Sequence, residues 1–157
     1  MSKRYAPAFA STLALALTMA ASPHGMAKDT GKGGRAVLLP AAEVKWADVP
    51  GFPGVQMAVL DGNPGKGPHH SMLKFAGGFA APVHYHTANH YGTVVSGNLV
   101  LTADGKETKL PPGSYFSFVG KAKHATRCEA GADCVVAIDA RSKWDVMPGE
   151  GKPAAKK

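Results

Sequence analysis

The sequence has 157 residues, of which 45% are apolar and 18% charged, with 19 glycines, 12 prolines and a formal net charge of +7. This length is that of one ordinary domain, and the composition excludes collagen, long coiled coils and extensive disorder. The positive charges are dispersed along the chain, which predicts a solvated basic surface and no nucleic-acid partner.

The first 27 residues have the pattern of a secretory signal peptide. Basic Lys3 and Arg4 precede the apolar run Phe9–Ala21, which is too short to span a bilayer comfortably. Small residues at 20–22 and 25–27 offer two cleavage sites, and the second is preferred over the first and over an uncleaved anchor. We therefore predict a periplasmic or secreted protein, without membrane association after cleavage, that begins with a flexible leader over 28–36.

The folded part is predicted over 37–147, followed by a flexible tail over 148–157. Short β-prone runs alternate there with turn signals at the spacing expected of a sandwich or barrel. The runs are Val55–Leu60, His70–Phe75, Phe79–His86, Tyr91–Val95, Leu99–Ala103, Lys106–Leu110, Tyr115–Val119, His124–Cys128 and Cys134–Ala140. Asp104-Gly105 predicts one hairpin, and the last two runs are expected to form another. A closed double-sheet barrel hides the edges of such strands, so the predicted class is all-β, a single domain.

The two cysteines, Cys128 and Cys134, flank a five-residue, turn-rich spacer. In an oxidising compartment this spacing favours a structural disulfide at the base of the predicted hairpin. Two thiolate metal ligands are the alternative, and the nearby histidines make it the weaker one.

Four of the seven histidines fall in a pattern that is typical of a metal site. His84 and His86 are two residues apart on a predicted strand, so both imidazoles point to the same face. His90 follows after a short connection, and His124 begins a later strand. Imidazole is a good ligand for Fe, Ni, Cu and Zn, and ligands from several strands converge inside a small barrel. We predict one divalent transition metal bound by His84, His86, His90 and His124.

These residues resemble the two motifs of the cupin superfamily. Its first motif, Gly-x5-His-x-His-x3-Glu-x6-Gly, corresponds to Gly78, His84, His86, His90 and Gly97, with His in the Glu position. Its second motif corresponds to Gly105, Pro111, Gly113 and His124, although Val119 replaces the usual proline and the usual later Asn is absent. The resemblance implies a double-stranded β-helix (jelly-roll) barrel with a metal site.

The resemblance leaves the reaction open, because cupins include dioxygenases, isomerases, decarboxylases and non-catalytic binders. Four neutral imidazoles leave a divalent ion with its full +2 charge, which favours an anionic ligand. The motif also lacks its carboxylate, so a base has to come from Tyr85, Tyr91 or metal-activated water. We predict a metal-dependent oxygenase, of the dioxygenase class, acting on a small organic molecule. A non-catalytic periplasmic cupin that binds metal or a small ligand is the alternative.

Other residues give weaker signals. Met72, Phe75, Phe79, Phe116 and Phe118 are expected to pack the barrel rather than to contact substrate. His69 and His70 are expected to be exposed at a strand entrance. Trp46 and Trp144 lie near the ends of the predicted domain, where they are expected to pack on its outside or in a homodimer interface.

Overall fold

A computed structural model describes residues 36–150 of the chain. The predicted signal peptide, nearly all of the predicted leader and residues 151–157 lie outside the described residues. The chain divides into the units Met1–Val37 and Leu38–Lys157, and all the strands described belong to the second unit. No helix within 36–150 is long and apolar enough to cross a membrane.

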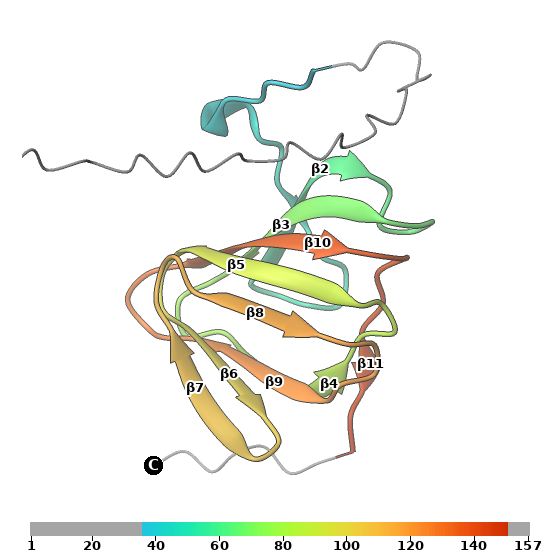
Figure 1. Ribbon diagram of the computed structural model, residues 1–157. Helices are drawn as coiled ribbons and strands as arrows, with labels where there is room; N and C mark the ends of the chain where they lie inside the picture. Colours follow the sequence, from blue (N-terminus) through green and yellow to red (C-terminus); the bar gives the residue numbers. More distant parts are fainter. Residues whose placement is uncertain (1–35, 151–157) are drawn as a thin grey trace, which may run out of the picture. The chain divides into compact units, whose positions relative to one another are not determined.

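Two antiparallel sheets make up this unit (Figure 1). The six-stranded sheet has the order β1-β2-β3-β10-β5-β8, with bounds Ala47–Asp48, Val55–Gly62, His69–Phe75, Cys134–Ala140, His90–Ser96 and Tyr115–Phe118. The five-stranded sheet has the order β11-β4-β9-β6-β7, with bounds Met147–Pro148, Ala80–Tyr85, His124–Cys128, Leu99–Ala103 and Lys106–Leu110. One short 3-10 helix, η1 (Ala41–Glu43), precedes them. The predicted all-β jelly-roll fold is confirmed.

All nine predicted strands are present, with ends that differ by at most a few residues. The hairpin of β6 and β7 is also confirmed: Asp104 and Gly105 have φ values of 50° and 75°. Such positive values are those of the tight turn that joins twisted antiparallel strands. The strands β1 and β11 are only two residues long, too short to show the alternation of apolar and polar residues that marks a strand, and they were not predicted. Because β11 contains Pro148, strand pairing continues into the predicted tail.

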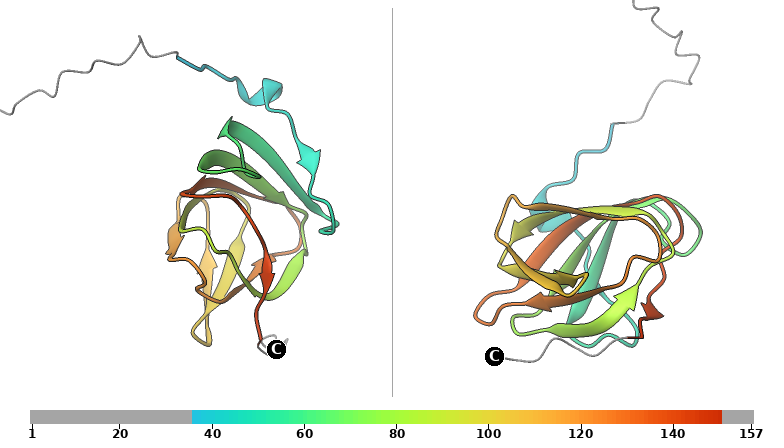
Figure 2. Two further views of the ribbon diagram at one scale, coloured as in Figure 1. Left: turned by 90° about the vertical axis from the view of Figure 1, so that its right-hand side faces the viewer. Right: turned by 60° about the horizontal axis from the view of Figure 1, so that its bottom comes forward.

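The predicted hairpin of His124–Cys128 with Cys134–Ala140 is wrong. β9 pairs with β4 and β6 in one sheet, whereas β10 pairs with β3 and β5 in the other. Both edges of each strand are therefore occupied, and neither has hydrogen-bonding groups left for the other. The connection between them crosses from one sheet to the other, as Figure 2 shows at the end of the unit.

The core lies between the two sheets. Alternate residues of β10 are buried, including Val136 and Ile138, as the two-residue period of a strand requires. On β5, Gly92 leaves room for an aromatic ring, because a Cβ there would lie 2.1 Å from the Phe116 ring. Phe75, Phe79, Phe116 and Phe118 pack against the buried cluster, as predicted, whereas Met72 alternates with the inward-facing Ser71 and Leu73 and is not part of that packing.

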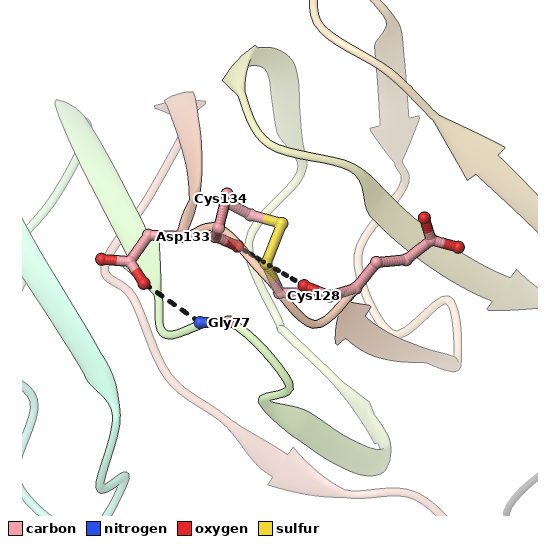
Figure 3. The surroundings of a disulfide bond; sticks show 6 residues. Gly77, Cys128, Asp133 and Cys134 are labelled. Atoms are coloured by element: carbon pink, nitrogen blue, oxygen red, sulfur yellow. Dashed lines mark hydrogen bonds between the residues drawn. A yellow bond between two sulfur atoms is a disulfide. The ribbon is translucent and has the colours of Figure 1, made fainter.

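A disulfide joins Cys128 at the end of β9 to Cys134 at the start of β10 (Figure 3). Both residues are fully buried, with Cα atoms 5.7 Å apart. The sequence predicts that this bond closes a hairpin. In the structure it links the two sheets instead. Next to it, the Asp133 carboxylate accepts a hydrogen bond of 3.0 Å from the Gly77 amide.

We expect reduction of this disulfide to lower the free energy of unfolding by about 2 kcal/mol, the value for release of such a short loop. Urea unfolding with and without reductant measures the change. The sequence contains no other cysteine, so this disulfide is the reductant's single target. The control is the Cys128→Ser/Cys134→Ser variant, whose unfolding should not change when reductant is added. Two alkylatable thiols in the native protein isolated without reductant would contradict the disulfide.

Candidate metal centre

The four predicted ligands come from three strand ends that meet in the barrel. His84 lies near the end of β4 and pairs in register with His124, the first residue of β9. His86 follows β4, and His90 begins β5 in the other sheet. All four are buried, with exposed fractions between 3% and 8%. Their rings lie close together, with centroids 4.4 Å apart for His84 and His124 and 4.8 Å apart for His86 and His90, so the four imidazoles converge as predicted.

Each imidazole is held by a backbone carbonyl through Nδ1. The Nδ1–H groups of His84, His90 and His124 donate to the carbonyl two residues earlier in the chain, at 2.8, 3.1 and 3.0 Å. His86 Nδ1 instead donates to the Asp145 carbonyl, far along the chain. A carbonyl only accepts, so Nδ1 has the proton and Nε2 has the free lone pair. This is the arrangement of imidazoles that bind metal through Nε2.

Three of these residues meet the geometric requirement for a shared ion. One ring nitrogen from each of His84, His86 and His124 lies within 4.8 Å of the other two. Nitrogen ligands at about 2.0–2.1 Å from an ion lie somewhat closer together, so small side-chain adjustments close the site. The chemistry of the donor set fits Fe, Ni, Cu or Zn better than Mg or Ca.

His90 lies beside this triad but is not one of its members. Its ring centroid is 4.8 Å from that of His86 and 5.9 Å from that of His124. The structure thus shows a His triad with a fourth imidazole next to it, and ligation by His90 stays a prediction.

Two aromatic rings support the imidazoles. Phe118 stacks on His124, with centroids 4.1 Å apart and planes 9° apart. Trp144 stacks on His86 at 4.0 Å and meets His90 edge-on at 5.1 Å. The expectation that Trp144 packs on the outside is therefore wrong, because the chain turns back across the barrel before it reaches this residue.

Residues 141–149, here called the closing segment, place Trp144 there. The Trp144 amide donates to the Pro64 carbonyl at 2.7 Å, and the Gly149 amide donates to the Val83 carbonyl at 2.9 Å. Between them β11 pairs with β4, beside His84 (Figure 2). The segment therefore lies against β4, which bears His84 and leads directly into His86.

Asp145 of the closing segment is a site residue that sequence reasoning missed. Its carbonyl holds His86, and its carboxylate accepts hydrogen bonds from the Thr87 amide at 2.8 Å and the Thr87 hydroxyl at 2.6 Å. Burial is the largest single influence and raises the pKa of this carboxyl, but the two Thr87 hydrogen bonds and nearby positive charge together lower the pKa below its usual value. No motif marks Asp145, because its contact with His86 is made by its backbone carbonyl.

Burial lowers the pKa of all four imidazoles, since the charged form loses its hydration. The effect brings the pKa of His86 to about 3 and that of His124 to about 4. Hydrogen bonds to backbone carbonyls oppose it, and neighbouring imidazoles add to it for each of these two residues. All four rings are thus neutral at pH 7, as metal ligands must be.

The imidazoles face a cavity of about 360 Å³ between the sheets. Its lining includes Phe75, Phe79, Phe116 and Phe118, so these rings form both core and cavity wall. Neither Tyr85 nor Tyr91 lines it, because they alternate with the histidines on their strands and point away. The two proposed side-chain bases are therefore not at this site.

His69 is buried, although the sequence predicts that it is exposed. It is 2% exposed, its Nδ1 donates to the Gly67 carbonyl at 3.1 Å, and its buried Nε2 has no hydrogen-bond partner. Its ring contacts Trp144 edge-on at 5.9 Å. Residue 69 begins β3 and shares its inward face with Ser71 and Leu73, whereas His70 points outward as predicted.

Comparisons with known proteins agree on the fold. Residues 71–140 match the family model described as the cupin domain. No curated protein matches the sequence significantly.

Three similar solved structures are each less than 25% identical to this chain in sequence. The polyketide cyclase RemF from Streptomyces resistomycificus is 17% identical, covering 72% of this chain and 84% of its own, with a TM-score of 0.61. An RmlC-like cupin from Shewanella frigidimarina is 20% identical, covering 68% and 92%, with a TM-score of 0.55. A predicted oxalate decarboxylase from Thermotoga maritima is 16% identical, covering 68% and 99%, with a TM-score of 0.57.

We expect alanine at His84, His86 or His124 to weaken Zn²⁺ or Ni²⁺ binding by about tenfold or more, because each change removes a ligand nitrogen. Competition with a chromogenic chelator measures the affinity. Exposed His70 offers the matched control, and His70→Ala should bind as the parent does. His90→Ala decides between a three-ligand and a four-ligand site. Unchanged stoichiometry and affinity in His84→Ala/His86→Ala would refute the site.

We expect the metal-free protein to lose stability as the pH falls below 6.5. The unfolded chain then takes up protons on these histidines, whereas the folded chain does not until the pH approaches 4 for His124 and 3 for His86. Protons therefore favour the unfolded state throughout that interval. Urea midpoints at several pH values measure the effect, and His124→Asn should reduce the dependence while His70→Asn should not. A pH dependence that is equal in all three proteins would contradict this account.

Proposed function

Because this chain belongs to the cupin superfamily and brings four neutral imidazoles together inside its barrel, we propose that it is an exported mononuclear metal protein. We propose further that it is a metal-dependent oxygenase acting on a small organic substrate. The signal-peptide pattern of residues 1–27 supports export to the periplasm or beyond.

The observation that supports metal binding most directly is the common pose of the imidazoles. Four Nδ1–H groups are fixed on backbone carbonyls, which leaves four Nε2 atoms for an ion. Because these four buried histidines stay neutral in the folded state, they lower the free energy of unfolding at acid pH. A cluster with this cost is typical of a functional site. A bound divalent ion supplies Lewis acidity and, in the case of Fe or Cu, redox chemistry with dioxygen.

The chain's own residues orient the ligands and exclude water. Trp144 and Phe118 cover the faces of His86 and His124, and the closing segment pairs with β4, which bears His84. No Asp or Glu in the described residues lines the cavity, so the protein offers no carboxylate there to remove a proton. This favours a substrate that is ionised before it binds or when it reaches the ion.

A non-catalytic cupin that binds metal or a small ligand is the second candidate. The missing carboxylate base supports it, and so does the fourth imidazole, which takes up a coordination position when it binds. Similar structures include a polyketide cyclase and a predicted oxalate decarboxylase, so the fold does not select a reaction.

We expect the Fe-, Ni- or Cu-loaded protein to consume oxygen with at least one member of a panel of small carbonyl, phenolic and thiol compounds. An oxygen electrode measures the uptake. The metal-free protein and His84→Ala/His86→Ala are the controls and should show none. If no loaded form takes up oxygen although metal and panel compounds bind, the oxygenase proposal is wrong and the non-catalytic candidate replaces it.

A further inference from the structure

We infer that the cavity binds a molecule with one anionic oxygen head group and an uncharged hydrocarbon body, preferably aromatic. The inference rests on the proposed metal-binding function and adds the class of ligand. It comes from the distribution of polar and apolar groups along the cavity.

The cavity has a polar end and an apolar end. β9 runs from His124 to Cys128, a rise of about 13 Å. The Cys128 amide donates to the Phe79 carbonyl at 2.9 Å, and Phe79 stacks on Phe75 with centroids 5.4 Å apart. On the neighbouring strand His84 pairs with His124. The imidazoles therefore lie at one end of the cavity and the Phe75–Phe79 pair at the other.

The wall between these ends is almost entirely hydrocarbon. Its aromatic members are Phe52, Phe75, Phe79, Phe116, Phe118 and Trp144. Apart from the four histidines, the polar groups of the lining side chains in the described residues are the Thr126 hydroxyl and the Trp144 indole N–H, and none of the lining residues has a charge. Aromatic walls of this kind favour flat, apolar ligands.

This wall disfavours ligands with a second charge or with many hydroxyl groups. A charge placed in the apolar half has no side chain to pair with, and an unpaired buried charge is strongly unfavourable. A sugar would leave most of its hydroxyl groups without partners. Dianions, zwitterions and sugars are thus poorer ligands than a hydrocarbon of similar size with one charged end.

The head group is expected to be anionic because of the imidazoles. They are neutral, so a divalent ion among them keeps its +2 charge, and an anion gains most from binding it. With no carboxylate in the wall to accept a proton, a carboxylate, phenolate or enolate that forms without help fits best.

Calorimetry on the Zn²⁺-loaded full chain tests the inference without turnover, with 3-phenylpropionate as the reference probe. Propionate lacks the ring, 3-[4-(aminomethyl)phenyl]propionate adds an ammonium at the far end, and 4-(2-carboxyethyl)benzoate adds a carboxylate there. We expect each to bind about tenfold or more weakly than 3-phenylpropionate, given the area of a phenyl ring and the penalty for an unpaired buried charge.

A wall variant reverses part of this preference. Phe79 is half-buried at the apolar end, so a lysine there can reach both the cavity and water. Phe79→Lys should strengthen binding of 4-(2-carboxyethyl)benzoate and weaken that of 3-phenylpropionate. Val95→Lys is the control, because Val95 is 48% exposed and does not line the cavity. Zinc stoichiometry and urea unfolding show whether each variant is folded.

The two proposals have separate readouts. If zinc does not bind, the metal function is wrong, and the ratio of 3-phenylpropionate to propionate affinity on the metal-free protein still tests the wall. Equal affinities for the four probes, or binding of none of them, overturn the inference. If Phe79→Lys misfolds, the ratios measured on the parent protein decide.

Discussion

The site depends on hydrogen bonds between imidazole Nδ1–H groups and backbone carbonyls. In three of the four cases the acceptor is the carbonyl two residues before the histidine, so the strand that presents the ring also fixes its tautomer. The acceptor is part of the main chain, and side-chain changes at Pro82, Ala88 or Ala122 do not remove it. The chemistry of the site is therefore built from strand geometry and needs no additional polar side chain in an apolar barrel.

The sequence was sufficient to predict the strands and the convergence of the histidines. Both follow from local rules: alternation along a strand, and turn residues such as Asp104-Gly105 that fix where a strand ends. His84 and His86 share a face because they are two residues apart, and the structure has them buried together.

Long-range pairing could not be predicted in the same way. The connection between Cys128 and Cys134 has the length of a hairpin loop, but competition from β4, β6, β3 and β5 decides the partners of these strands. Trp144 and Asp145 reach the site through a segment without a strong pattern, and their contributions are a stacked ring and a carbonyl. His69 is buried because β3 begins one residue earlier than the apolar run indicates.

His86 depends on a carbonyl 59 residues farther along the chain, so the site can be completed only late in synthesis. When the ribosome has added the last strand of the six-stranded sheet, β10, all four histidines are already present, but the acceptor for His86 is not. A nascent or truncated chain that ends before residue 145 leaves this ring free to rotate, with no acceptor to fix the proton on Nδ1. Full assembly of the candidate metal centre therefore awaits completion of the domain. A chain cut short between 140 and 145 would keep strands β1 to β10 but lack β11 and a properly oriented His86.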